Sequence, residues 1–149
     1  MLALCVVLAG ALAAEPAAPA EQGLLVGDPW MRFVMASRPA AGYFILSNAT
    51  PEPRTLVGAA SPACGMLMLH QTVHQGGVDR MEMVKEVAVP ANGSVSFAPG
   101  GYHLMCMSPS PDLIPGRSVA VTLRFANGGE LTASFPVRGA SDTPAPPPR

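Results

Sequence analysis

Charged and aromatic side chains are both scarce in this chain of 149 residues. Only 13% of the residues are Asp, Glu, Lys or Arg, and the nine Lys and Arg residues are scattered singly along the sequence. No basic stripe is therefore available to follow a phosphate backbone. Phe, Trp and Tyr make up 5% of the residues, which leaves too few rings for base-stacking platforms. The composition argues against a nucleic-acid-binding protein.

Recognisable catalytic motifs are also missing from the sequence. No set of Ser, His and Asp has a supporting motif, and no glycine-rich loop leads into a helix that could hold phosphate. Asp28, Asp79 and Asp112 stand beside proline or in turns, where capping of the backbone explains them. We therefore predict that the protein is not an enzyme, with no catalytic residues and no organic cofactor.

No segment sustains a helical period, and short apolar runs alternate with turn signals instead. The 17 prolines and 15 glycines disfavour long helices and favour many short strands. Residues 119–125 have the period of a half-buried strand, and Asn127-Gly128-Gly129 after them predicts a hairpin. We predict an all-β fold, an antiparallel β-sandwich rather than a barrel. The expected strands cover residues 24–26, 30–34, 41–47, 55–60, 66–73, 81–84, 94–97, 103–107, 118–125 and 131–136.

The two ends of the chain differ from the middle in composition. Residues 1–14 form an apolar run that ends in small residues, as in a cleaved export signal, although no Lys or Arg precedes the run. The run is too short to span a membrane, so we expect a periplasmic protein without stable membrane insertion. Residues 15–23 are predicted to be a flexible leader and residues 139–149 a disordered proline-rich tail. One folded domain is expected between them, at residues 24–138.

Four soft-metal side chains stand out within that domain: His70, Met81, His103 and Met105. A thioether is a neutral, polarizable donor that binds hard cations poorly, whereas imidazole suits several transition metals. On a strand, the two-residue period puts His103 and Met105 on one face. The glycine-containing segment between His70 and Met81 can fold back as a hairpin and bring that pair to the same end of the sandwich. The set predicts a site for monovalent copper.

The order and spacing of these four residues resemble a known family. The pattern His70-x10-Met81-x21-His103-x-Met105 is similar to the signature of periplasmic copper chaperones that serve copper insertion into respiratory oxidases. Ala41-Gly42-Tyr43-Phe44, Leu56-Val57-Gly58-Ala59 and Pro99-Gly100-Gly101-Tyr102 also look like that family.

The resemblance implies a cupredoxin-like sandwich that binds Cu(I) through His70, Met81, His103 and Met105. It further implies a metallochaperone that delivers copper by ligand exchange to cytochrome oxidase copper centres. The implied partners are the copper ion and, as acceptor, a respiratory oxidase subunit or its assembly factors.

Some residues allow other interpretations. Met83 shares a strand face with Met81 and is the main substitute ligand, whereas His74 is expected to be a solvated side chain. The other internal methionines are expected to fill gaps in the core, as flexible side chains commonly do. These are Met31, Met35, Met66, Met68 and Met107.

The two cysteines of the domain could be bridged or free, and two other functions also fit the donor set. Cys64 and Cys106 suit a disulfide in an exported protein, but strand counting puts them on opposite faces. A bridge would need a kink or bulge in one strand, so a buried Cys106 thiol and a loop Cys64 thiol are favoured. The alternative functions are a periplasmic copper storage or resistance protein and an electron-transfer cupredoxin. The latter needs Cys106 as a copper ligand, and its position after His103 argues against that role.

Overall fold

The computed structural model describes residues 19–142, which form ten β-strands and no helix. The predicted all-β fold is therefore confirmed. Within the described range no helix exists that is long and apolar enough to cross a membrane. The strands are β1 (Leu24–Arg32), β2 (Ala40–Asn48), β3 (Arg54–Ala60), β4 (Cys64–Gln75), β5 (Val78–Met83), β6 (Val87–Val89), β7 (Gly93–Phe97), β8 (Tyr102–Pro109), β9 (Ser118–Phe125) and β10 (Glu130–Arg138).

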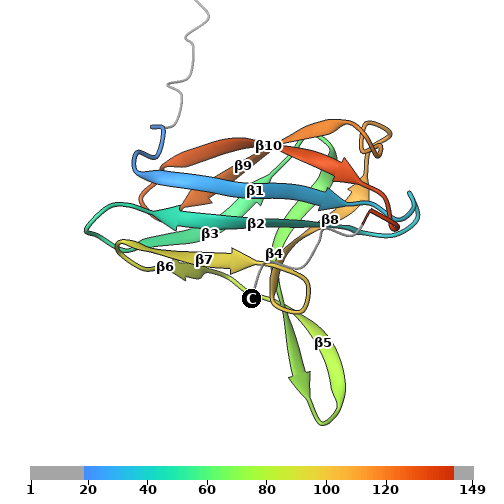
Figure 1. The fold of residues 1–149 in the computed structure, drawn as a ribbon, viewed down its shortest axis with the longest axis horizontal. Helices are drawn as coiled ribbons and strands as arrows, with labels where there is room; N and C mark the ends of the chain where they lie inside the picture. Colours follow the sequence, from blue (N-terminus) through green and yellow to red (C-terminus); the bar gives the residue numbers. More distant parts are fainter. Residues whose placement is uncertain (1–18, 143–149) are drawn as a thin grey trace, which may run out of the picture.

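The strands form two layers that are joined along one side (Figure 1). One layer has the order β5-β4-β8-β7-β2-β1, and the other has the order β10-β9-β3-β6. A short parallel pairing of β1 with β10 links them, and the other neighbours pair antiparallel except for β7 with β8. The row of strands ends at β5 and β6, so the sheet is open rather than a closed barrel.

The core lies between the two layers and is built from the inward face of each strand. Phe44 of β2 stacks on Phe97 of β7 with ring centroids 4.3 Å apart, and meets Phe135 of β10 edge-on at 5.6 Å. Because Phe135 belongs to the other layer, this trio shows the layers packed face to face. Other side chains with almost no solvent exposure complete the core, among them Met31, Leu46, Leu56, Leu104, Val121 and Leu123.

Most predicted strands are present, with two differences. The predicted break between residues 26 and 30 does not divide β1, because the strand continues through an irregularity at which Asp28 adopts a φ of 46°. Strand β6, over Val87–Val89, was not predicted, since a run of three residues carries little periodic signal. The hairpin at Asn127 is confirmed, and its side-chain oxygen accepts a hydrogen bond from the Gly129 backbone N–H.

The N-terminal end of the described chain is attached to the sandwich. Ala20 forms a bridge with Glu130, and the backbone N–H of Glu21 donates to the Glu130 carbonyl at 3.0 Å. The Glu21 carboxylate also pairs with Arg54 at 3.4 Å. The last residues of the predicted leader, residues 15–23, thus contact the sandwich through Ala20 and Glu21. The predicted signal peptide, residues 1–14, and residues 143–149 of the predicted tail lie outside the described residues.

Strands β4 and β5 form a hairpin that extends away from the body of the sandwich (Figure 1). Gly76 and Gly77 make its turn with φ values of 62° and 77°, a left-handed conformation that glycine adopts without steric cost. The predicted fold-back between His70 and Met81 is thus confirmed. His74 is exposed near the tip, as predicted, and faces Asp79 across the hairpin at 2.5 Å.

Candidate metal centre

Strand pairing brings the two predicted histidine ligands together. β4 runs antiparallel beside β8, with His70 directly opposite His103 and Met68 directly opposite Met105. Opposite residues of an antiparallel pair project their side chains from the same face of the sheet. Three of the four predicted ligands therefore share one face of two neighbouring strands.

The fourth predicted ligand comes from β5, on the other side of β4. Met83 lies directly opposite His70, and Met81 lies opposite Thr72, one same-face position further along the hairpin. The two methionines are 66% and 62% exposed, respectively. Register therefore brings Met83 closer than Met81 to the histidine pair, although both thioethers project from the same face as His70.

The same face carries further methionines that were predicted to fill the core. Met66 of β4 lies opposite Met107 of β8, which continues the series of paired residues beyond Met68 and Met105. Met66 is 58% exposed and Met107 is half-buried. We call this surface of β4, β5 and β8 the donor face; its soft-metal side chains are Met66, Met68, His70, Met81, Met83, His103, Met105 and Met107.

The prediction of core methionines is therefore correct for one residue. Met31 has no solvent exposure and packs in the core. Met35 is 47% exposed, and Met66, Met68 and Met107 are on the donor face. Met66, Met68 and Met107 are outside the core because side chains alternate between the two faces of a strand. The inward positions of β4 and β8 are taken by other apolar residues. Those residues are Leu67, Leu69, Leu104 and Cys106.

The histidine rings have buried nitrogens that no protein group satisfies. The ring centroids of His70 and His103 are 5.8 Å apart. Both nitrogens of His70 and the Nε2 atom of His103 are buried, and none has a hydrogen-bond partner among the described residues. A buried polar atom without a partner costs about 1–3 kcal/mol. In a neutral imidazole one nitrogen carries the proton, so a cation that accepts one lone pair from each ring would remove part of that penalty.

A backbone contact orients the ring of His103, which is 3% exposed. Its Nδ1 atom lies 3.2 Å from the carbonyl oxygen of Gly101, to which an Nδ1–H can donate. A neutral ring that donates from Nδ1 keeps its lone pair on Nε2, the atom without a partner. This arrangement is typical of a metal-ligating histidine.

Burial also keeps the second histidine in the form that binds metals. Removal from water lowers the pKa of His70, and the neighbouring His103 lowers it further. The imidazole of His70 is therefore neutral at pH 7, with a free lone pair. The charge state and the missing hydrogen bonds both favour a metal ligand.

Aromatic residues cover the side of His103 that faces away from β4. The ring of Tyr43 lies 6.4 Å from that of His103 and 4.7 Å from that of Trp30, and Arg138 sits 5.3 Å above the Trp30 ring. Burial raises the pKa of Tyr43, while the charge of Arg32 acts in the opposite direction. The histidine pair is thus enclosed on the β2 side and open on the β5 side, where the exposed methionines lie.

The donor set excludes the usual sites for hard cations. Among residues 19–142 no group of three or more His, Cys, Asp or Glu could hold a metal ion. The side-chain donors that strand pairing places beside His70 and His103 are thioethers, which suit soft monovalent metals. The donors present fit Cu(I) and fit Zn²⁺, Mg²⁺ or Ca²⁺ poorly.

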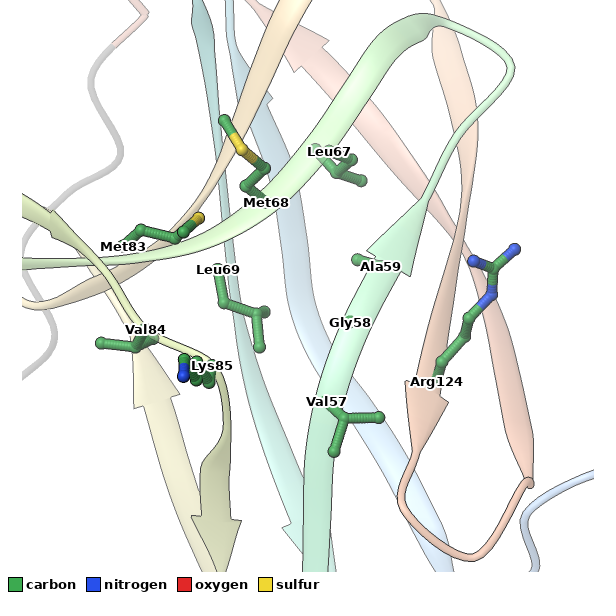
Figure 2. A pocket seen from close by; sticks show the side chains of 10 residues that line it. All are labelled: Val57, Gly58, Ala59, Leu67, Met68, Leu69, Met83, Val84, Lys85 and Arg124. Carbon is green, nitrogen blue, oxygen red and sulfur yellow. The ribbon is translucent and has the colours of Figure 1, made fainter.

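A groove of about 370 Å³ lies beside the donor face. Met68 and Met83 form one rim and Val57–Ala59 of β3 the opposite rim (Figure 2). Neither histidine lines this groove. The groove therefore adjoins the candidate metal centre and is not the centre itself.

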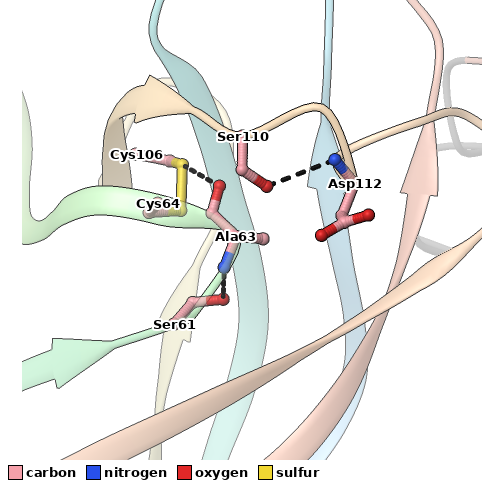
Figure 3. Close-up of a disulfide and its surroundings, with 6 residues drawn as sticks. All are labelled: Ser61, Ala63, Cys64, Cys106, Ser110 and Asp112. Atoms are coloured by element: carbon pink, nitrogen blue, oxygen red, sulfur yellow. Dashed lines mark hydrogen bonds between the residues drawn. A yellow bond between two sulfur atoms is a disulfide. The ribbon is translucent and has the colours of Figure 1, made fainter.

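The two cysteines of the domain form a disulfide, Cys64–Cys106, with Cα atoms 5.4 Å apart (Figure 3). The favoured prediction of two free thiols is wrong. Strand counting assumes regular pairing, but next to Cys64 no pair joins Gly65 to Ser108, and Ser108 adopts a left-handed φ of 50°. Since both sulfurs are in the bridge, neither is available as a thiolate ligand to copper.

Comparison with known proteins identifies the family to which this β-sandwich domain belongs. The model of the LpqE-like family, described as "Putative lipoprotein LpqE-like", matches residues 24–137. This chain belongs to the LpqE-like family. A relative from Leifsonia xyli, "Putative lipoprotein Lxx21020", is 33% identical over 92% of this chain and 82% of its own length.

Solved structures with a similar fold include copper proteins. The Cu(I) form of DR1885 from Deinococcus radiodurans is 32% identical, with a TM-score of 0.62 over 80% of this chain and 83% of that chain. The copper-bound PCuAC domain of PmoF2 is 23% identical, with a TM-score of 0.65 over 82% of this chain and 97% of that domain. At the latter identity only the fold is shared. These findings confirm the resemblance to periplasmic copper chaperones and the cupredoxin-like β fold that the sequence motifs predicted.

Proposed function

We propose that this protein is an exported Cu(I) metallochaperone that delivers copper by ligand exchange to cytochrome oxidase copper centres. The observation that carries the proposal is the His70–His103 pair, whose three buried ring nitrogens have no partner among the described residues. Thioethers surround this pair on the donor face. The relation to DR1885, solved in a Cu(I) form, supports the choice of metal.

The proposed ligands are His70, Met81, His103 and Met105. The histidines come from adjacent strands, and Met105 follows His103 on the same face of β8. Met81 is assigned from the spacing His70-x10-Met81 of the signature, and it lies on the same face as His70, one same-face position beyond Met83. Copper stays monovalent throughout, and each donor of an acceptor replaces one donor of this site, so no free ion forms.

The periplasm is the proposed location. A disulfide between Cys64 and Cys106 persists in oxidising compartments and is rare in the cytosol. The family description as lipoproteins also favours export. The copper acceptor is proposed to be an oxidase subunit or an assembly factor that loads it.

The function is tested by direct transfer. Protein loaded anaerobically with one equivalent of Cu(I) is mixed with a metal-free copper domain of an oxidase subunit, and both are separated and analysed for copper. We expect the ion to move to the acceptor even when a chromophoric Cu(I) chelator is present to capture released metal. His74→Asn, which changes the exposed histidine, is the matched control and should transfer normally. Copper that stays on the protein, or that reaches only the chelator, would favour storage over delivery.

The assignment of Met81 can be tested with a matched pair of variants. Met81→Leu should weaken Cu(I) binding by at least about tenfold, whereas Met83→Leu should change it much less. Both side chains are exposed, so neither change should lower the free energy of unfolding by more than about 0.5 kcal/mol. Affinity is measured by competition with a chelator. The reverse order of effects would transfer the ligand role to Met83.

A further inference from the structure

Two methionine pairs continue the donor face beyond the histidines. Along β4 and β8 the opposite pairs are Met66 with Met107, Met68 with Met105, and then His70 with His103. Successive same-face positions on a strand are about 6.7 Å apart, and opposite Cβ atoms are about 5 Å apart. A patch of four thioethers therefore adjoins the histidine pair without a gap.

Packing in the core between the two layers does not account for these methionines. Their face is the outer one, since the inward positions of the two strands are filled by buried residues such as Leu67 and Leu104. Met66 is 58% exposed, and six of the nine methionines in the chain lie on the three strands of this face. An exposed methionine fills no gap in the core, but it offers a sulfur lone pair to a soft metal.

We propose that Met66, Met68 and Met107 form a second Cu(I) site, built from thioethers alone. Each side chain has three rotatable bonds, so three sulfurs at this spacing can converge on one ion. Met105 lies between the two sites, opposite Met68 and two residues from His103. An ion bound by the three thioethers can therefore exchange onto Met105 and then onto the histidines. Copper remains Cu(I), and no proton is released because thioethers carry none.

This site rests on the proposed function, which supplies Cu(I) as the cargo, and it deepens that function. It gives the protein a weaker loading position next to the tighter histidine site. A strong chelator should therefore leave one ion bound, and the second ion should appear only when that competition is removed. Several equally tight ions would instead indicate a storage protein.

The test uses the full chain with ¹³C-labelled methionine methyl groups and Ag(I) as a redox-stable monovalent probe. The first equivalent should shift the methyl signals of Met105 and of Met81 or Met83. The second equivalent should shift Met66, Met68 and Met107. Met31 in the core and the exposed Met35 serve as internal references, and neither signal should move.

Two variants separate this inference from the proposed function. Met66→Leu with Met107→Leu should abolish the second equivalent and keep the first, while Met35→Leu should keep both. His70→Asn with His103→Asn should lose the tighter equivalent but keep the shifts of Met66, Met68 and Met107. One bound ion, with Met66 and Met107 unshifted, would overturn the second site and leave the function intact. A second equivalent that shifts Met35 equally would mean non-specific binding and would also overturn it. No bound ion at all would contradict the proposed function itself.

Discussion

Replacing His103 with Asn should lower the Cu(I) affinity of the protein by at least about 100-fold. Loss of a residue that merely orients a metal ligand already costs about 10–100-fold, so loss of a ligand should reach or exceed the upper value. His70→Asn should have a similar effect, since the two rings lie opposite each other and offer the buried nitrogens of the site. Affinity is measured anaerobically by competition with a Cu(I) chelator.

The stability of the metal-free variants distinguishes a ligand role from a structural one. The unpartnered nitrogens of His70 and His103 gain no hydrogen bond from the fold, so His70→Leu should not lower the free energy of unfolding of the metal-free protein. Urea unfolding measures this quantity. A large loss of stability with unchanged copper affinity would show that His70 is a packing residue and would contradict the ligand assignment.

Acid should weaken copper binding reversibly, because protons compete with Cu(I) for the histidine nitrogens. Burial lowers the pKa of His70, so this ring stays neutral at pH 7 and accepts a proton only below the ordinary histidine value of about 6.5. Cu(I) affinity should therefore be level near neutral pH and fall as the pH drops further below that value. Thioethers do not titrate, so constant affinity down to about pH 4 would contradict a site with two histidines.

The lowered pKa of His70 also makes the stability of the metal-free protein depend on pH. The unfolded chain takes up a proton on His70 at a higher pH than the folded chain does, because the pKa is lowered only in the folded state. Stability of the metal-free protein should therefore fall as the pH drops from about 6.5 through the lowered pKa of His70. Bound Cu(I) should oppose this loss, since it occupies the lone pairs that the protons would take.

Removing the disulfide should have the largest effect on stability. Cys64 and Cys106 are 42 positions apart, and the chain-entropy model gives about 4 kcal/mol for closing a loop of that length. The double variant Cys64→Ala with Cys106→Ala should lose stability of that order, as measured by urea unfolding under oxidising conditions. Reduction of the unchanged protein should reproduce the loss.

Removing the disulfide should lower stability but leave Cu(I) binding nearly unchanged. The Cys106 side chain is on the core side of β8, whereas Met105 and His103 project from the donor face. The folded double variant should therefore bind Cu(I) with nearly unchanged affinity. A disulfide variant that keeps full stability but loses copper would mean that the sulfurs serve the metal centre directly. An intense Cu(II)–thiolate band in the reduced protein would likewise favour the electron-transfer alternative.

Local pattern alone determined the kind of fold and the kind of metal site. The two-residue period placed His103 and Met105 on one face, and glycine and asparagine located the turns at Gly76-Gly77 and Asn127-Gly128. These properties depend on neighbouring residues, because side-chain direction alternates along a strand and left-handed turns favour particular residues. The soft donor set also follows from residue types alone, since imidazole and thioether chemistry is independent of the fold.

Only the tertiary structure decided which strands are neighbours and in what register. The pairing of β4 with β8 set His70 against His103, and the pairing of β4 with β5 set Met83 against His70. The irregular backbone at Ser108 lies next to the Cys64–Cys106 bridge, and the filled inward positions of β4 and β8 leave their methionines on the outer face. Register between distant strands depends on the packing of the whole sandwich, where a shift of one residue would move every donor to the other face. A periodic pattern within each strand does not contain that information.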